Sequence, residues 1–233
     1  MFLTKGRPPK RITGAIFDLD GTILDTMVQW DSLGLRYLQE LGIEPKQDFL
    51  DRIGTMSLRE SAQVFHDEYG VALDVSEIIR ELVARLRVLY SDEARLKPGA
   101  LDSLRLLKRG GAEIALATAT SNELACAGLM RNGALKFFDG IFSCRDPEIK
   151  ESKSSPKIFD VARKFLGSPL DETIVVEDAL YAIKTAKRAG YFVVAIEDES
   201  ERTRKDEIVE TADVYVENHA ALCDWLRGRL NEE

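Results

Sequence analysis

This sequence has few cysteines, no net positive charge and no long apolar runs, and each shortage argues against a class of protein. Three cysteines among 233 residues do not build a disulfide framework, so we expect a reducing compartment. Forty acidic residues against 32 basic ones give a net charge of −8, which argues against nucleic-acid or acidic-membrane partners. No apolar run approaches a membrane span, and the basic residues 1–11 are not followed by the apolar h-region of a signal peptide. We expect a soluble cytoplasmic protein.

The chain does have enough length and apolar content for a sizeable core. Its 233 residues allow one large domain, or a core with a smaller insert. Hydrophobic residues at 45% and charged residues at 31% are typical of a soluble globular protein. The negative net charge does not exclude an anionic substrate, because one lysine and one metal ion can make a site locally positive.

Two carboxylates follow the first apolar run. Residues 12–17 are predicted to form a buried strand, with Asp18 and Asp20 at its carboxyl end and Gly21 allowing the backbone to turn away. Paired acids there suit a metal site, because a hard cation prefers oxygen ligands. Aspartate is also a covalent nucleophile toward phosphoryl groups. The alternative is an ordinary Asp-Gly turn after a strand.

Residues 26–95 are predicted to be helical, with no clear strand. Ser57 and Glu60 form a capping box before an apolar stripe that ends at Gly70. A further helix is expected to start near Ser76. Such stripes are core positions far more often than functional ones. We therefore expect a compact helical unit, 26–95, inserted into a core formed by 1–25 and 96–233.

From Pro98 onward, strands and helices alternate. The predicted elements are a helix at 101–108, a strand at 112–117, a helix beginning near Asn122, a strand at 140–143, a helix at 156–166, a strand at 173–176, a helix at 179–189 and strands at 192–196 and 214–216 before a last helix. This alternation predicts right-handed βαβ units and a parallel sheet, hence an α/β fold. The charged run 197–210 is expected to be a solvated loop or helix face.

Polar side chains follow several of these strands. Thr118 ends one strand, Glu177 and Asp178 follow another, and Lys153 lies in the segment before the helix at 156–166. Each has a bland alternative: Thr118 as a helix cap, Lys153 as a solvated lysine, and the acids as favourable charges at a helix start. Because ligands of open parallel sheets bind beyond the carboxyl ends of strands, we expect these residues to converge with Asp18 on one site.

Taken in order, these motifs resemble those of the haloacid dehalogenase-like superfamily, in particular its phosphatase and phosphoglucomutase-like subgroup, over nearly the whole chain. The D-x-D-G-T motif matches residues 18–22, the second motif matches Thr118, and the third matches 152–159 around Lys153. The final E-D pair matches Glu177-Asp178, with A-x-x-A-G at 186–190. The resemblance implies a Rossmann-like three-layer core around a parallel sheet and identifies the helical insert as a type-one cap.

Two motifs depart from the family pattern. In the third, Ser152 and Ser154 replace the usual Gly and Pro, and Lys150 and Lys157 lie close enough to compete with Lys153. Lys153 keeps the expected distance to the following Pro and Phe, so we assign it the lysine role. After the E-D pair, Ala179 and Ala182 replace the more usual Ser and Gly, which weakens detailed inference about the surroundings of that pair.

The resemblance also implies roles for the site residues. Asp18 would be the nucleophile that forms an aspartyl-phosphate, and Asp20 the general acid and then base. Thr118 and Lys153 would bind the phosphoryl oxygens. Mg²⁺ is the implied cofactor, held by the Asp18 carboxylate, the Asp20 backbone carbonyl and Asp178, while Glu177 acts through a bound water or by orienting its neighbour.

We expect a magnesium-dependent phosphatase that hydrolyses a small soluble phosphomonoester and is a monomer. Asp20 argues against dehalogenation, which needs no proton donor for its leaving group. Sugar phosphomutases resembling this subgroup usually carry a His where this chain has Trp30, so the mutase stays the alternative. A binding module that has lost catalysis is the alternative from another class. Gln29, Arg52 and Arg59 of the insert could reach a substrate, although a solvated helix face explains each of them as well.

Overall fold

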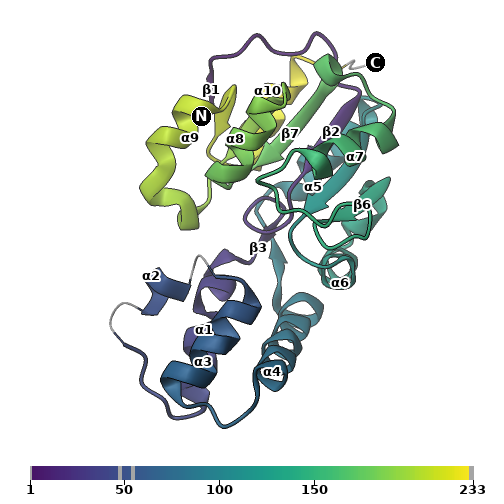
Figure 1. The fold of residues 1–233 in the computed structure, drawn as a ribbon. Coiled ribbons are helices and arrows are strands. Elements are labelled where there is room, and N and C mark those ends of the chain that lie inside the picture. The colour runs from purple at the N-terminus through teal and green to yellow at the C-terminus, as the bar shows by residue number, and fades with distance from the viewer. Residues whose placement is uncertain (1, 47–48, 54–55, 231–233) are drawn as a thin grey trace. The chain divides into compact units, whose positions relative to one another are not determined.

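The computed structural model describes residues 2–46, 49–53 and 56–230 of the chain. They form two compact units, Met1–Asp25 with Ala94–Glu233, and Thr26–Glu93 (Figure 1). The boundaries proposed from the sequence fall within two residues of these divisions. The assignment of the smaller unit as a cap remains a prediction.

A seven-stranded sheet forms the centre of the larger unit, in the order β1-β9-β8-β7-β2-β5-β6. All neighbouring strands are parallel except β1, which runs antiparallel to β9. The strands are β1 (Phe2–Thr4), β2 (Gly14–Phe17), β5 (Glu113–Thr118), β6 (Gly140–Ser143), β7 (Thr173–Glu177), β8 (Phe192–Ile196) and β9 (Val214–Val216). The predicted α/β fold with a parallel sheet is confirmed.

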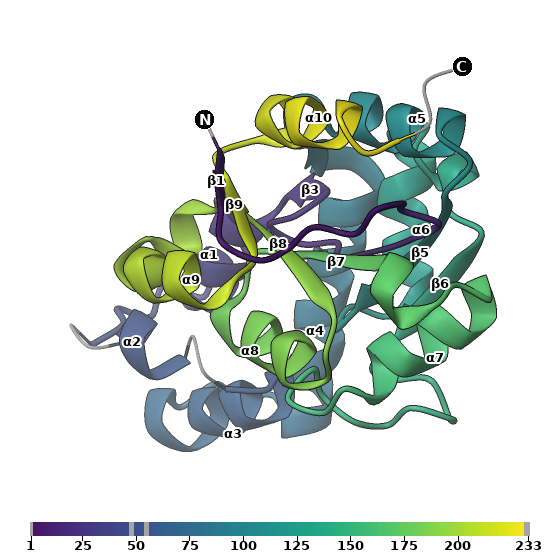
Figure 2. The same cartoon turned by 90° about the horizontal axis from the view of Figure 1, so that it is seen from above.

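Helices cover both faces of this sheet. They are α5 (Ala100–Arg109), α6 (Asn122–Arg131), α7 (Lys157–Leu166), α8 (Leu180–Arg188), α9 (Lys205–Thr211) and α10 (His219–Arg227), with short 3₁₀ turns η2 (Leu135–Phe137), η3 (Leu170–Glu172) and η4 (Glu199–Arg204). The helices α7, α8 and α9 share one apolar core with the sheet, while α5 and α10 lie on the opposite face (Figure 2). Strands buried on both faces explain the near-continuous apolar runs of β2, β7 and β8.

The strand register brings three carboxyl ends to the same level. Phe17 of β2 is paired with Leu116 of β5 on one side and with Val176 of β7 on the other. The next residue, Asp18, donates its backbone N–H to the Val176 carbonyl at 3.0 Å. Residues that follow β2, β5 and β7 are therefore neighbours at one edge of the sheet, as the site hypothesis requires.

Three short strands escaped prediction. The first is β1, at the edge of the sheet beside β9. The other two are β3 (Leu24–Asp25) and β4 (Arg95–Leu96), which pair with each other where the chain leaves and re-enters the larger unit. Strands of two or three residues carry no readable alternation, because their pairing is decided by a distant partner.

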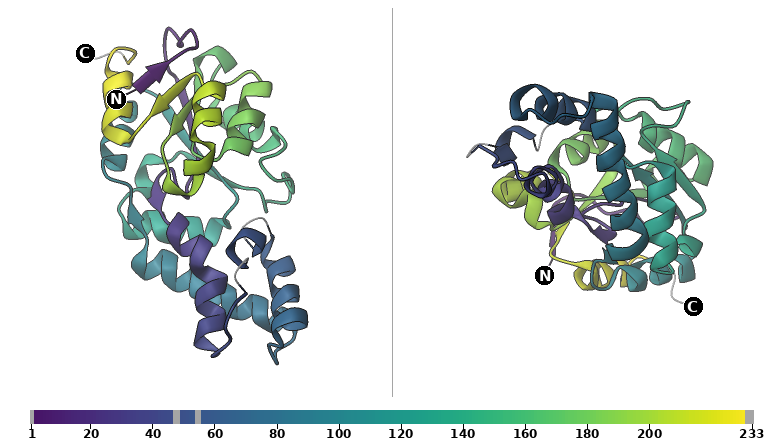
Figure 3. Two further views of the ribbon diagram at one scale, coloured as in Figure 1. Left: turned by 90° about the vertical axis from the view of Figure 1, so that its left-hand side faces the viewer. Right: turned by 90° about the horizontal axis from the view of Figure 1, so that it is seen from below.

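The smaller unit is helical, as predicted. It contains α1 (Met27–Glu40), α2 (Phe49–Ile53), α3 (Leu58–Tyr69), α4 (Val75–Val88) and a turn of π-helix, η1 (Leu89–Glu93) (Figures 1 and 3). The capping box of Ser57 and Glu60 is present at α3, and Gly70 ends that helix with a φ of 66°. An aromatic cluster around Phe65 fills the core. None of the described helices in either unit is long and apolar enough to cross a membrane.

Candidate active site

A tight turn after β2 carries the paired acids. The N–H groups of Ile23 and Leu24 both donate to the Leu19 carbonyl at 2.8 Å, and Gly21 donates to the Leu24 carbonyl at 2.8 Å. Gly21 has a φ of 83°, a backbone conformation that residues with a side chain rarely adopt. The glycine that follows the two acids in the sequence is thus required by the positive φ of the backbone at this position.

Lys153 lies between two of the predicted acids. Its Nζ donates to Oδ1 of Asp18 and, at 2.5 Å, to Oε1 of Glu177. Lys153 is only 2% exposed, so the interpretation as a solvated loop lysine is wrong. The competing Lys157 instead bonds to the Ile149 carbonyl and to Glu151, and Lys150 is exposed. Among the three candidate lysines, the structure brings Lys153 to the carboxylates.

The burial of this cluster shifts its proton equilibria. Burial lowers the pKa of Lys153, but Asp18 and Glu177 outweigh that effect and raise it above its usual value. Burial raises the pKa of Glu177 to about 7, although Lys153 opposes the shift. Burial, together with the charges of Glu177 and Asp18, raises the pKa of Asp178 well above its ordinary value. Such shifts in several adjacent groups are typical of functional sites.

Three carboxylates of this cluster could hold a metal ion. One oxygen each from Asp18, Glu177 and Asp178 lies within 4.8 Å of the others, and all three residues are buried. If all are ionised, three negative charges face the single positive charge of Lys153. A hard divalent cation would neutralise that excess, because Mg²⁺ favours carboxylate oxygens and a few waters. The residues present therefore fit the predicted cofactor.

Asp20 and Thr118 meet through a third residue. Thr120 donates its hydroxyl to Oδ2 of Asp20 at 2.7 Å, and its backbone N–H bonds to Oγ1 of Thr118 at 3.0 Å. Thr118 does not cap the following helix, whose N-cap is Ser121. Because the Thr118 oxygen acts as acceptor in this bond, its own hydroxyl hydrogen remains a donor. Five of the six predicted site residues thus lie at the carboxyl ends of β2, β5 and β7. The sixth, Lys153, comes from the segment before α7.

The profile of the haloacid dehalogenase-like hydrolases matches residues 15–196. The chain belongs to this family.

Relatives in the family carry phosphatase names. The (DL)-glycerol-3-phosphatase 1 of Arabidopsis thaliana is 32% identical over 197 residues, which are 80% of this chain and 64% of that protein. The phosphorylated carbohydrates phosphatase of Thermotoga maritima is 24% identical over 175 residues, 75% of this chain and 80% of its own length. The predicted class, a phosphoric monoester hydrolase, is confirmed at the level of the family.

A solved structure shows the same fold. CbbY from Rhodobacter sphaeroides, crystallised in complex with phosphate, superposes with a TM-score of 0.73 at 24% sequence identity. The match covers 91% of this chain and 96% of that one. The likeness supports the haloacid dehalogenase-like fold of the larger unit together with a helical insert, and leaves the substrate open.

Sequence reasoning missed four residues around this haloacid dehalogenase-like site. Thr22 donates its hydroxyl to Oδ1 of Asp178 at 2.9 Å, and Thr120 bonds to Asp20 as described. Both stand inside or beside recognised motifs, so their hydroxyls were a readable signal. Lys97 and His219, which bond to the turn after Asp20, lie far from every motif and gave none.

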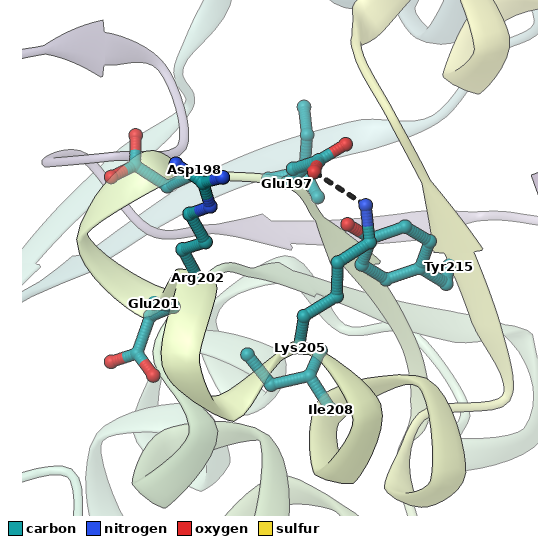
Figure 4. Close-up of a pocket in the computed structure, with 8 residues that line it drawn as sticks. Glu197, Asp198, Glu201, Arg202, Lys205, Ile208 and Tyr215 are labelled. Carbon is teal, nitrogen blue, oxygen red and sulfur yellow. Dashed lines mark hydrogen bonds and ion pairs between the residues drawn. The ribbon is translucent and has the colours of Figure 1, made fainter.

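The expected solvated run, 197–210, is partly wrong. Asp198 is paired with Lys97 at 2.8 Å, with its side chain only 7% exposed, and Glu201 and Ile208 are buried. Side chains of this run and Tyr215 line a small hollow, where Lys205 is ion-paired with Glu197 at 2.6 Å (Figure 4). Asp198 was misjudged because its partner Lys97 lies on a distant segment, whereas Glu201 pairs with Arg204 inside the run.

Proposed function

We propose that this chain is a magnesium-dependent phosphatase that hydrolyses small soluble phosphomonoesters through an aspartyl-phosphate intermediate. The observation that carries the proposal is the buried ion triad of Asp18, Lys153 and Glu177 beside Asp178. Burying these charges costs several kcal/mol per ion, on the order expected for carboxylates in proteins. Catalysis of phosphoryl transfer, which depends on positioning and charge neutralisation, accounts for that cost.

Asp18 would be the nucleophile. One oxygen of its carboxylate attacks phosphorus, a bond forms between that oxygen and phosphorus, and the bond from phosphorus to the leaving alcohol oxygen breaks. Lys153 holds Oδ1 of Asp18 by a hydrogen bond, which fixes the carboxylate before the attack. Asp18 is buried at the end of a strand, so little reorganisation accompanies the reaction.

Asp20 would transfer the proton in both steps. It protonates the departing alkoxide and then removes a proton from the water that attacks phosphorus in the aspartyl-phosphate, which regenerates Asp18 and releases phosphate. The hydrogen bond from Thr120 to Oδ2 of Asp20 orients this carboxyl group.

Lys153 and Thr118 would bind the phosphoryl oxygens. An ammonium group has three N–H donors, and Lys153 directs two of them to Asp18 and Glu177. The third is suited to a phosphoryl oxygen near Asp18, where charge builds up in the transition state. Thr118 contributes its hydroxyl from the neighbouring strand end.

Asp18, Asp178 and the backbone carbonyl of Asp20 would hold Mg²⁺, and Glu177 would contact it through water or orient Asp178. The bound ion would neutralise charge on the phosphoryl group. Glu177 is placed for an orienting role, because its Oε2 accepts the backbone N–H groups of Asp178 at 3.1 Å and Ala179 at 3.2 Å. Its other oxygen is already bonded to Lys153.

A phosphatase is favoured over a sugar phosphomutase by Trp30. At the position where the resembling mutases usually have His, the Trp30 indole donates its N–H to the Tyr90 hydroxyl at 2.8 Å. An indole has no acceptor and cannot serve as an acid or base. The relatives named for glycerol phosphate and phosphorylated carbohydrates make phosphorylated polyols and sugars the first substrates to test. The insert, 26–93, would act as a cap over the site and set this specificity.

The decisive test uses the purified chain with an aryl phosphate and a panel of phosphorylated polyols and sugars, with Mg²⁺ or with chelator. We expect hydrolysis that requires Mg²⁺, and a loss of at least about 1,000-fold in kcat for Asp18→Asn with an unchanged circular dichroism spectrum. Wild-type-like turnover in Asp18→Asn would refute the nucleophile. A protein that binds substrates without any turnover would support the non-catalytic alternative.

A further inference from the structure

The turn after β2 is held by two side chains from outside the recognised motifs. The carbonyl oxygens of Gly21 and Thr22 are consecutive, and each accepts a hydrogen bond from a distant residue. Lys97 Nζ donates to Gly21 at 2.6 Å, and His219 Nε2 to Thr22 at 2.8 Å. These partners lie 76 and 197 residues away along the chain. Both carbonyls belong to the turn that also carries Asp20.

Lys97 joins three segments at this point. Besides Gly21, its Nζ contacts the Glu197 carbonyl at 2.7 Å and Oδ2 of Asp198 at 2.8 Å, and its backbone N–H bonds to the Ile23 carbonyl at 2.9 Å. The Lys97 and Asp198 side chains are 14% and 7% exposed. All three N–H donors of this ammonium group are bonded to oxygens, so Lys97 restrains the turn. Moving the turn would break a charge-assisted hydrogen bond in mostly buried surroundings, where such a bond is strong.

His219 holds the second carbonyl from α10. A carbonyl oxygen only accepts, so Nε2 carries the hydrogen, while Nδ1 lies 2.8 Å from the Ser103 hydroxyl, which is also within 2.9 Å of the Ala100 carbonyl. His219 is fully buried. The start of α10 reaches the turn because residue 99 is glycine: a Cβ there would lie 3.2 Å from the His219 Cβ.

Thr22 transmits this restraint to the acids. Its carbonyl is held by His219, while its hydroxyl donates to Oδ1 of Asp178 at 2.9 Å. We propose that Lys97 and His219 are positioning residues that fix the Gly21–Thr22 turn and, through Thr22, orient the Asp178 carboxylate for a divalent cation. This inference rests on the metal site of the proposed function. Groups that orient metal ligands typically contribute 10-fold to 100-fold in metal affinity.

Binding of Mn²⁺ to the full chain without substrate tests the inference, with free Mn²⁺ followed by electron paramagnetic resonance. We expect Lys97→Met and His219→Leu to raise the Kd for Mn²⁺ about tenfold. Lys97→Arg keeps a charged donor, and His219→Gln keeps an N–H directed at Thr22, so both should bind within about threefold of wild type. Leu fills the His219 site as well as Gln does, but only Gln keeps an N–H donor. Weaker Mn²⁺ binding in His219→Leu than in His219→Gln would therefore come from the lost hydrogen bond and not from poorer packing.

Ser103→Ala is the matched control. It removes a hydrogen bond from the far side of the His219 ring but leaves the bond to Thr22, so Mn²⁺ affinity should stay near wild type while the melting temperature falls. Wild-type Mn²⁺ affinity in folded Lys97→Met and His219→Leu would overturn the inference and leave the proposed function standing. If His219→Leu does not fold, Lys97→Met and Lys97→Arg decide the question. A wild-type chain that binds no Mn²⁺ would overturn the metal site itself.

Discussion

The larger unit of this protein contains deeply buried ion pairs beside exposed ones such as Arg227–Asp224, whereas the ion pairs described in the smaller unit are all at least partly exposed. In the smaller unit, Arg85 pairs with Glu40 and Glu81, and all three side chains are between 28% and 56% exposed. In the larger unit, Lys153 pairs with Asp18 and Glu177 at 10% exposure or less. Exposed pairs contribute little to stability and keep a protein soluble, whereas buried ones carry a desolvation cost. The difference indicates which unit contains the chemistry.

The two histidines show the same contrast. His66 lies exposed at the end of α3 in the smaller unit. His219 is fully buried in the larger unit, where burial and the nearby Lys97 lower its pKa to about 4. Each unit thus contains a cation and a histidine, buried in the larger unit and at least partly exposed in the smaller one. Comparing substitutions of a buried and an exposed group tests whether burial or the chemical type of the side chain determines the change in the free energy of unfolding.

The largest effect is expected for Lys153→Met. It leaves buried carboxylates without their cation, so we expect a loss of about 3–5 kcal/mol in the free energy of unfolding, together with loss of phosphatase activity. Urea unfolding in chelator measures the first quantity. The chain has two tryptophans, Trp30 in the smaller unit and Trp225 in the larger, so a Trp30→Phe background lets Trp225 fluorescence report the larger unit.

Added Mg²⁺ sharpens this test. The cation should restore more stability to Lys153→Met than to the parent protein, because it neutralises the carboxylates that the lysine no longer covers. A loss below about 1 kcal/mol, the range of an exposed ion pair, would contradict the distinction between the two units.

His219 should give the next largest effect, as a pH dependence of stability. Its pKa of about 4 in the folded protein lies below the ordinary 6.5. The stabilisation is therefore complete above pH 6.5 and is lost as the pH falls toward 4, because the unfolded chain takes up the proton first. A shift of this size corresponds to about 3 kcal/mol.

The measurement is the free energy of unfolding between pH 4 and 7.5, taken as the difference between wild type and variant. His219→Gln should flatten the acid slope in this window. Equal slopes in wild type and His219→Gln would show that folding does not lower the pKa of His219.

The sheet and most site residues could be predicted from the sequence for a physical reason. The boundaries of β6, β8 and β9 match the predicted 140–143, 192–196 and 214–216, because apolar runs and turn residues are local signals. Asp18 was found because strand ends of a parallel sheet share one edge, and Lys153 because it keeps the expected distance to the Pro and Phe of the third motif.

What was missed depends on partners that no local pattern reveals. Lys97 resembles any polar residue before a proline, and His219 any residue at a helix start, until the fold brings each to a carbonyl of the turn. Asp198 was expected in solvent and is instead paired with Lys97. Single long-range hydrogen bonds between unlike segments leave no periodicity in the sequence.

Asp178→Asn should have a smaller effect on stability than on metal binding. Asparagine keeps an Oδ1 that accepts from Thr22 but removes one negative charge. We expect the Mg²⁺ concentration for half-maximal activity to rise about 100-fold. In chelator the variant should be as stable as wild type or more so, because burial and Glu177 disfavour the Asp178 charge. An unchanged magnesium titration would refute its role as a ligand.

The smallest effect is expected for Arg85→Met in the smaller unit. The substitution removes ion pairs at 2.6 Å to Glu40 and 2.9 Å to Glu81, and a cation over the Tyr37 ring at 4.9 Å, yet keeps an unbranched apolar side chain over that ring. Solvent screens both pairs, so the free energy of unfolding should fall by less than about 1 kcal/mol. Circular dichroism during urea unfolding measures this, and Mg²⁺ affinity should not change. A loss as large as that of Lys153→Met would mean that exposure does not distinguish the charges of the two units.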